Sequence, residues 1–136
     1  MRIRLLTGLC AACLCAGALA QMVAPLHADR VLVLKKQHTL ELLNQGKVIK
    51  TYKIALGADP VGPKTRQGDH KTPEGVYVLD SRTAHSRFYR AIHISYPNAQ
   101  DRANARKIGA SPGGDVFVHG LPNGHGALGA AHRLHD

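Results

Sequence analysis

The sequence predicts a mainly β domain with one short helix. Short runs rich in β-branched and other apolar residues recur between residues 30 and 118, and turn-forming residues separate several of them. Four Tyr, two Phe and no Trp mean that the core must be mostly aliphatic. About 116 residues follow an apolar N-terminal segment, which is enough for one domain with a modest core. No internal repeat or second domain is visible.

The first part of this domain predicts three strands that follow one another through tight turns. The runs are RVLVLK at 30–35, TLELLN at 39–44 and VIKTYKIAL at 48–56, with Gln45-Gly46 as a turn. Residues 57–75, GADPVGPKTRQGDHKTPEG, are too rich in glycine and proline for a regular element. A loop of this length inside a small domain is usually either functional or disordered.

The second part predicts further strands around one helix. We expect strands at 76–80 (VYVLD), 89–95 (YRAIHIS) and 116–118 (VFV), the last of which leads into His119-Gly120. Residues 97–108 hold three alanines and few β-branched residues, so they predict a short polar helix that begins near Asn98.

The N-terminal segment, MRIRLLTGLCAACLCAGALA, has the basic start, apolar stretch and small-residue end of a secretory signal peptide. We therefore expect a signal peptide at 1–20, a short lead at 21–29 and one domain at 30–136. Cys10, Cys13 and Cys15 are the three cysteines of the sequence, and lipidation at one of them is an alternative. The mature chain would then contain no disulfide, no thiol nucleophile and no thiolate ligand.

Charge favours some partners over others. Without Arg2 and Arg4 the 18 Lys and Arg fall to 16, against 9 Asp and Glu, which leaves a formal charge of +7. An exported chain with no basic run interleaved with aromatics is not expected to bind nucleic acid. An anionic polymer or membrane surface fits a dispersed positive field better, and a basic surface without a specific partner is the alternative.

His119 is the first candidate for chemistry. It ends an apolar strand and precedes a loop, which is where catalytic groups are often held, and histidine is the usual general base near neutral pH. A structural histidine bonded to backbone is the alternative. Lys64 and Lys71 would either steer an anionic substrate or be solvated, while Asp69, Glu74 and Asp80 do not predict an acid/base pair.

The tail also contains His125, His132 and His135. The last two form His-x-x-His, which on one helical turn would ligate a metal, but the glycine-rich surroundings do not favour a helix there. We expect no metal and no cofactor, and a histidine-rich metal binder is the weakest alternative.

Three stretches together resemble the L,D-transpeptidase catalytic domain, the YkuD-like family of bacterial cell-wall enzymes. They are VLVLKKQHTLELLNQGKVIKTYKIALG, GPKTRQGDHKTPEGVYVL and VFVHGLPNGHGALGAAHRLHD. The details FYRAIHISYPN and HGLPNG are most similar to a periplasmic subgroup, which includes the enzyme that detaches the outer-membrane lipoprotein from peptidoglycan. The resemblance implies a YkuD-like β-sandwich, incomplete at its C-terminus here, in the periplasm or cell envelope.

The resemblance also implies a mechanism. A cysteine thiolate attacks the carbonyl after meso-diaminopimelate in a peptidoglycan stem peptide, and an amine or water resolves the thioacyl enzyme. His119 matches the family's proton donor and acceptor, and Gly120 and His132 are expected to bind substrate. Stem peptides are the implied partners, with an outer-membrane lipoprotein as a further donor or acceptor; the oligomeric state is not predicted.

The nucleophile departs from the family pattern. The family's cysteine follows the histidine in a Gly-Cys motif, whereas residues 16–136 contain no cysteine. We expect either a truncated product of a complete enzyme or a short, non-catalytic paralogue that binds peptidoglycan, and favour truncation. The chain alone is expected to be inactive in either case.

Overall fold

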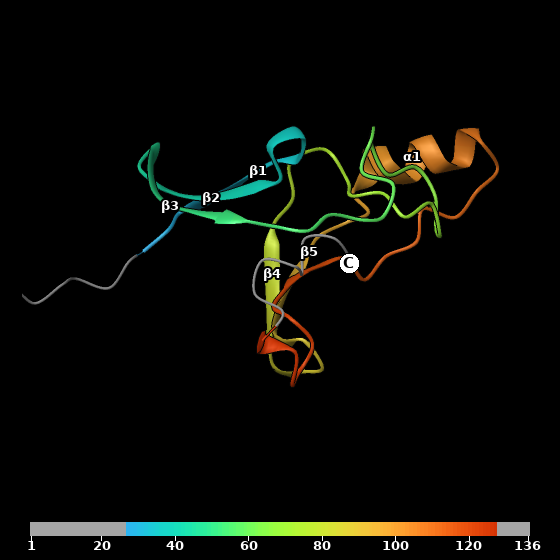
Figure 1. Cartoon of the computed structure of the whole chain (residues 1–136). Coiled ribbons are helices and arrows are strands. Elements are labelled where there is room, and N and C mark those ends of the chain that lie inside the picture. Colours follow the sequence, from blue (N-terminus) through green and yellow to red (C-terminus); the bar gives the residue numbers. More distant parts are fainter. Residues whose placement is uncertain (1–26, 128–136) are drawn as a thin grey trace, which may run out of the picture.

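The computed structural model describes residues 27–127. It contains two antiparallel three-stranded sheets, ordered β1-β2-β3 and β4-β5-β6, together with helix α1 and one turn of 3-10 helix, η1 (Figure 1). The mainly β fold with one short helix is thereby confirmed, and it is consistent with a YkuD-like sandwich. Among residues 27–127 no helix is long and apolar enough to span a bilayer.

The first sheet is the predicted meander. Its elements are β1 (Arg30–Leu34), η1 (Lys35–Gln37), β2 (Thr39–Asn44) and β3 (Lys47–Lys53). Gln45 and Gly46 both have positive φ, at 49° and 77°, as a two-residue type I′ hairpin turn requires. Leu40 and Leu43 of the central strand are buried, so β2 supplies the apolar side of this sheet.

The second sheet contains His119 in its short strand β6. Its strands are β4 (Leu79–Ser86), β5 (Tyr89–Ile94) and β6 (Phe117–His119). β5 lies in the middle, and its Ala91 pairs with His119 while His93 pairs with Phe117. These pairs put the end of β6 next to the middle of β5.

The prediction of a strand at residues 76–80 is wrong in its position. The Val78 N–H donates to the Ser95 hydroxyl rather than to a ladder carbonyl, and the Tyr77 hydroxyl is bonded to Asp101. The strand begins at Leu79 and runs on to Ser86 through polar residues because β5 pairs with them in a hairpin. Pairing with a neighbouring strand has overridden the local preference.

Helix α1 (Ala99–Lys107) confirms the predicted helix and its start. The Asn98 side chain accepts from the Asp101 N–H at 3.0 Å, and the Asp101 carboxylate accepts from the Asn98 N–H at 2.9 Å, which makes a capping box. Arg106 and Lys107 in the last turn complement the helix dipole.

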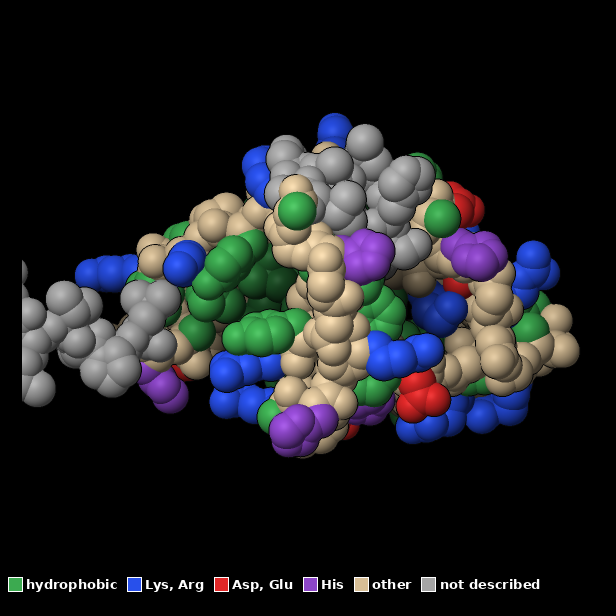
Figure 2. Space-filling view, turned by 60° about the horizontal axis from the view of Figure 1, so that its bottom comes forward, with side chains coloured by type: hydrophobic (Ala, Val, Ile, Leu, Met, Phe, Trp, Pro, Cys, Tyr) green, Lys and Arg blue, Asp and Glu red, His purple; other side chains and the backbone are tan. Residues whose placement is uncertain are grey.

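The buried apolar core is small. Among the described residues it consists of Leu40, Leu43, Leu56, Ala91, Tyr96 and Ala105. Eleven larger apolar side chains are exposed, including Val76 and Val61, and Figure 2 shows green hydrophobic groups gathered in a hollow beside blue basic ones. The fold is therefore held together by polar contacts as well as by apolar burial.

Candidate active site

An open pocket of about 540 Å³ lies where β4, β5 and β6 meet the long loop. Ala91, Phe88, Phe117 and His119 line its sheet side, and Lys64 and Lys71 reach it from the loop. Figure 1 shows that this loop, drawn in green, passes beside helix α1 before it enters β4. The pocket thus brings together segments that are far apart in the sequence.

His119 is the last residue of β6 and lines this pocket. Its Nδ1 lies 2.9 Å from the Gly120 carbonyl oxygen. A carbonyl only accepts, so in the neutral ring Nδ1 carries the proton and Nε2 carries the basic lone pair. The Phe88 ring lies against the imidazole at 4.4 Å between centroids and fixes its plane further.

Gly120 contributes through its backbone. Its N–H donates to the Arg90 carbonyl at 3.1 Å, and a Cβ at this position would lie 3.0 Å from the Phe88 carbonyl oxygen. A side chain would therefore push the β4–β5 turn away from His119. The expectation that Gly120 binds substrate stays a prediction; the contact seen here is with the histidine ring.

Asn123 was not singled out from the sequence, yet it ties the loop after β6 to the β4–β5 turn. Its N–H donates to the Arg87 carbonyl at 2.9 Å, and its side-chain amide accepts from the Tyr89 N–H at 2.9 Å and donates to the Ser86 carbonyl at 3.1 Å. The only sequence signal was an Asn before Gly in a turn, which says nothing of a partner more than thirty residues away.

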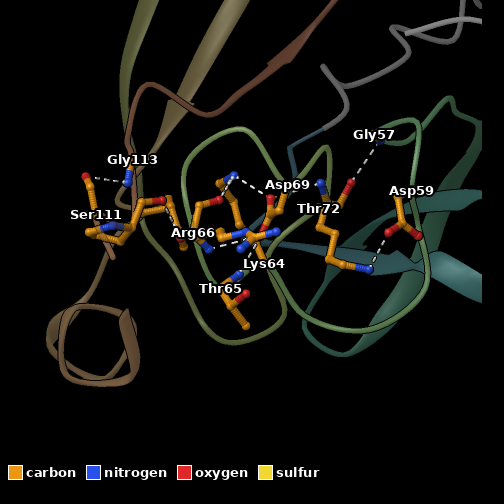
Figure 3. A network of polar contacts seen from close by, with 12 residues as sticks. Gly57, Asp59, Lys64, Thr65, Arg66, Asp69, Thr72, Ser111 and Gly113 are labelled. Atoms are coloured by element: carbon orange, nitrogen blue, oxygen red, sulfur yellow. Dashed lines mark hydrogen bonds and ion pairs between the residues drawn. The ribbon is translucent and has the colours of Figure 1, made fainter. Parts of the chain in front are cut away.

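The long loop is ordered around Asp69 (Figure 3). The Asp69 carboxylate accepts from Lys64 Nζ at 2.8 Å and from the N–H groups of Thr65, Arg66 and Lys71 at 2.8, 3.0 and 3.2 Å. Burial by itself raises the pKa of Asp69, but these donors outweigh it and hold the pKa well below the ordinary value. The loop is thus built around a stable anion.

The lysines of the loop are engaged in the same way. Lys64 pairs with Asp69 at 2.8 Å, and Lys71 pairs with Asp59 at 2.7 Å and donates to the Val61 carbonyl at 2.6 Å. Both of them line the pocket, but their charges are already matched by carboxylates. They hold the loop in shape, which leaves them poorly placed to steer a substrate.

The loop also rests on a buried tyrosine. Tyr96 is only 3% exposed, its hydroxyl donates to the Pro112 carbonyl at 2.9 Å, and Lys64 Nζ lies 5.9 Å from its ring centroid. Burial and the nearby carboxylates of Asp101 and Asp69 raise the pKa of Tyr96 to about 12. This tyrosine is therefore a neutral support and not a base.

The remaining candidates lie apart. Glu74 pairs with Lys35 and Asp80 pairs with His93, so within residues 27–127 no two carboxylates face each other across the pocket. In the same range no group of three or more His, Cys, Asp or Glu is arranged to hold a metal. His132 and His135 lie outside the described residues.

These features agree with the comparisons with known proteins. The family model of the L,D-transpeptidase catalytic domain, YkuD, matches residues 28–133, and the chain belongs to this family. The chain is 37% identical over 94 residues to the "Putative L,D-transpeptidase YafK" of Escherichia coli strain K12, covering 65% of this chain and 36% of that protein. The protein of the same name from Escherichia coli O157:H7 gives the same values. The chain spans about a third of the length of these curated relatives.

Proposed function

We propose that this domain serves peptidoglycan L,D-transpeptidation or the related hydrolysis in the cell envelope, with His119 as the base. Family membership supports the reaction class. The observation that carries the assignment of the base is the bond from Nδ1 of His119 to the Gly120 carbonyl, because it puts the basic lone pair on Nε2. A tautomer fixed by a hydrogen bond at the other nitrogen is what a histidine base needs.

In the proposed reaction, Nε2 of His119 accepts the proton of a cysteine thiol. The thiolate attacks the carbonyl that follows meso-diaminopimelate, and a carbon–sulfur bond forms. The peptide C–N bond then breaks, and the imidazolium returns its proton to the leaving amine. The Gly120 carbonyl stabilises the imidazolium through Nδ1–H. An incoming amine or water, deprotonated by the same histidine, resolves the thioester.

The printed sequence has its cysteines only at positions 10, 13 and 15. We therefore propose that this chain provides the histidine half of the catalytic pair and does not turn over substrate by itself. The full chain, incubated with muropeptides that carry tetrapeptide stems, should leave them unchanged. Turnover that persists when Cys10, Cys13 and Cys15 are replaced by Ser would contradict the thiol mechanism, and turnover that survives His119→Ala would also exclude His119 as the base.

A second function has an observation in its favour. The pocket and the Asp69-centred loop are formed although residues 16–136 contain no cysteine, as a non-catalytic module that binds peptidoglycan would require. Binding of stem peptides without turnover fits both functions. Thiol-dependent turnover when a cysteine is supplied next to Nε2 would favour the enzyme, and its absence would favour the binding module.

The base assignment has a direct test. Long-range ¹⁵N–¹H correlation spectra of the full chain above pH 8 report which imidazole nitrogen is protonated. We expect the Nδ1–H tautomer for His119, and we expect the tautomer mixture of a solvent-exposed ring for His85, an exposed residue of β4 without a side-chain bond in residues 27–127. An Nε2–H tautomer at His119 would show that the histidine is structural.

Export and a lipoprotein partner belong to the same proposal. The signal-like segment at 1–20 supports export, and the sequence details shared with the periplasmic subgroup support an outer-membrane lipoprotein as donor or acceptor. Cell fractionation of the full chain would test the first point, with a cytoplasmic location as the contrary result.

A further inference from the structure

The pocket contains a basic side chain that the fold does not use. Three basic residues line the pocket, and two of them, Lys64 and Lys71, are neutralised by Asp69 and Asp59. The third, Arg87, is exposed, and within residues 27–127 its guanidinium forms no ion pair and no hydrogen bond. A guanidinium at a pocket, with no carboxylate of residues 27–127 paired with it, invites an anionic ligand.

The backbone holds Arg87 next to the histidine. Its carbonyl accepts from the Asn123 N–H at 2.9 Å, and the side chain of the next residue, Phe88, packs on the His119 ring. Asn123 also bonds the residues on either side of this pair, Ser86 and Tyr89. The turn that carries Arg87 is therefore fixed to the same short loop that positions His119.

Asp115, which also lines the pocket, does not neutralise the charge of Arg87. Asp115 is exposed and unpaired within residues 27–127, and it precedes β6, four residues before His119. No ion pair joins it to Arg87. Arg87 therefore keeps its charge without a paired carboxylate among the described residues, and Phe88 beside it provides an apolar wall that weakens screening by water.

We propose that Arg87 is the carboxylate anchor of this pocket and binds the free C-terminal carboxylate of a stem peptide, one residue beyond the carbonyl that is attacked. This inference rests on the proposed function. An arginine fork matches a carboxylate with two parallel hydrogen bonds, and its planar group cannot be replaced by an amide without loss of charge. Arg87 would therefore select acyl donors whose stem peptide ends one residue after the attacked carbonyl.

The experiment compares two ligands on the full chain at low temperature. A tetrapeptide stem with a free C-terminal carboxylate and the same peptide with a C-terminal amide are titrated into ¹⁵N-labelled protein, and the amide signals of the pocket residues are followed. We expect the acid to bind about tenfold more tightly, the lower end of what a hydrogen bond to a charged group contributes. Arg87→Gln should lose that preference and bind both peptides as the wild type binds the amide.

Two variants serve as controls. Arg82→Gln removes an exposed arginine of β4 that does not line the pocket, so it should keep the full preference for the acid. Arg87→Lys keeps the charge but not the fork, and should retain only part of the preference. Each variant's dispersed spectrum checks its fold, and the ligand comparison in the wild type stands without any variant.

Equal affinity for acid and amide in the wild type would overturn the role of Arg87, as would a preference that survives in Arg87→Gln. In both of these cases the shifted pocket signals would still support the proposed function. If neither peptide shifts the pocket signals, the carboxylate anchor and the stem-peptide function fail together.

Discussion

One backbone oxygen determines which nitrogen of the neutral His119 ring carries the proton. The sequence shows a histidine at the end of an apolar strand, which suits a base and a structural residue equally well. The Gly120 carbonyl at 2.9 Å from Nδ1 and the Phe88 ring against the imidazole define which nitrogen is basic and which way it faces. Such precision needs no unusual residue, only the turn of the chain after β6.

Gly57 is a position where a methyl group cannot be accommodated. A Cβ there would lie 2.3 Å from the carbonyl oxygen of His70, a backbone atom that cannot rotate away. We predict that Gly57→Ala lowers the free energy of unfolding by about 2 to 3 kcal/mol, the cost of overpacking. Urea denaturation measures this, with Gly114→Ala as the control because its Cβ would meet open space. Equal midpoints for the two variants would contradict the predicted clash.

Asp69 predicts a pH dependence of stability. Its folded-state pKa is depressed, so the stability from the ionised carboxylate is present above the unfolded value of about 3.9 and is lost as the pH falls toward the lower folded-state pKa. Asp69→Asn should cost about 3 kcal/mol at pH 7, because it leaves the nearly buried Lys64 without its counter-charge. The gap between variant and wild type should narrow as the pH falls from 4 to 2.

Urea titrations across this pH range test the prediction. Asp59→Asn is the matched control, since Asp59 is also paired with a lysine but is 57% exposed, and water screens a surface pair, so its effect should be much smaller. A gap for Asp69→Asn that stays constant with pH would mean that its charge does not stabilise the loop.

In the second sheet, pairing between the strands determines where each strand lies. Residues 79–86 are mostly polar and exposed, and they form a strand because β5 pairs with them. The strand β6 has three residues, and among residues 27–127 it pairs only with β5 of the same sheet. A short strand at a sheet edge needs support from its flanking loop, and Asn123 provides it.

We predict that Asn123→Ala loosens the β4–β5 turn. The change removes the bonds to the Tyr89 N–H and the Ser86 carbonyl, which together contribute about 1 to 2 kcal/mol. Hydrogen exchange at the Tyr89 amide should accelerate about tenfold, in line with the middle of that range. In Asn123→Asp, which keeps the acceptor, the exchange rate of the Tyr89 amide should lie between those of Asn123→Ala and the wild type. Exchange at Tyr89 as slow as in the wild type would show that other contacts hold the turn.

The whole molecule combines a small core with a well-bonded loop. Six apolar residues are buried among those described, and no large side chain there falls below 2% exposure. Apolar burial contributes about 25 cal/mol per Å². Because little apolar surface is buried, the stabilisation exceeds the cost of chain entropy by only a modest margin. The polar network around Asp69 orders the loop but does not replace a core.

We therefore predict marginal stability for the chain. Thermal unfolding followed by circular dichroism should be broad, the free energy of unfolding should lie near or below about 5 kcal/mol, and a dye that binds exposed apolar surface should fluoresce with the native protein. Loss of the dye signal on addition of a stem peptide would place part of that surface in the pocket. A sharp, cooperative melt of a monomer without dye binding would contradict this prediction.

The sequence by itself determined the elements with local signals. Asn98 and Asp101 marked the start of α1, Gln45-Gly46 marked the first hairpin, and the glycines and prolines of 57–75 excluded regular structure there. Three ordered stretches also resembled the family to which the chain belongs. The helix start, the hairpin turn and the irregular loop each depend on residues within a few positions of one another, so one chain segment carries the whole signal.

Only the tertiary structure decided how the candidate site is built. It moved the fourth strand to Leu79–Ser86, paired Lys64 and Lys71 with carboxylates, and joined Asn123 to a turn more than thirty residues away. It also left Arg87 as the pocket cation without a counter-charge in the described residues. The physical reason is that hydrogen bonds and ion pairs depend on distances of a few ångströms between distant segments, which only packing of the whole chain sets.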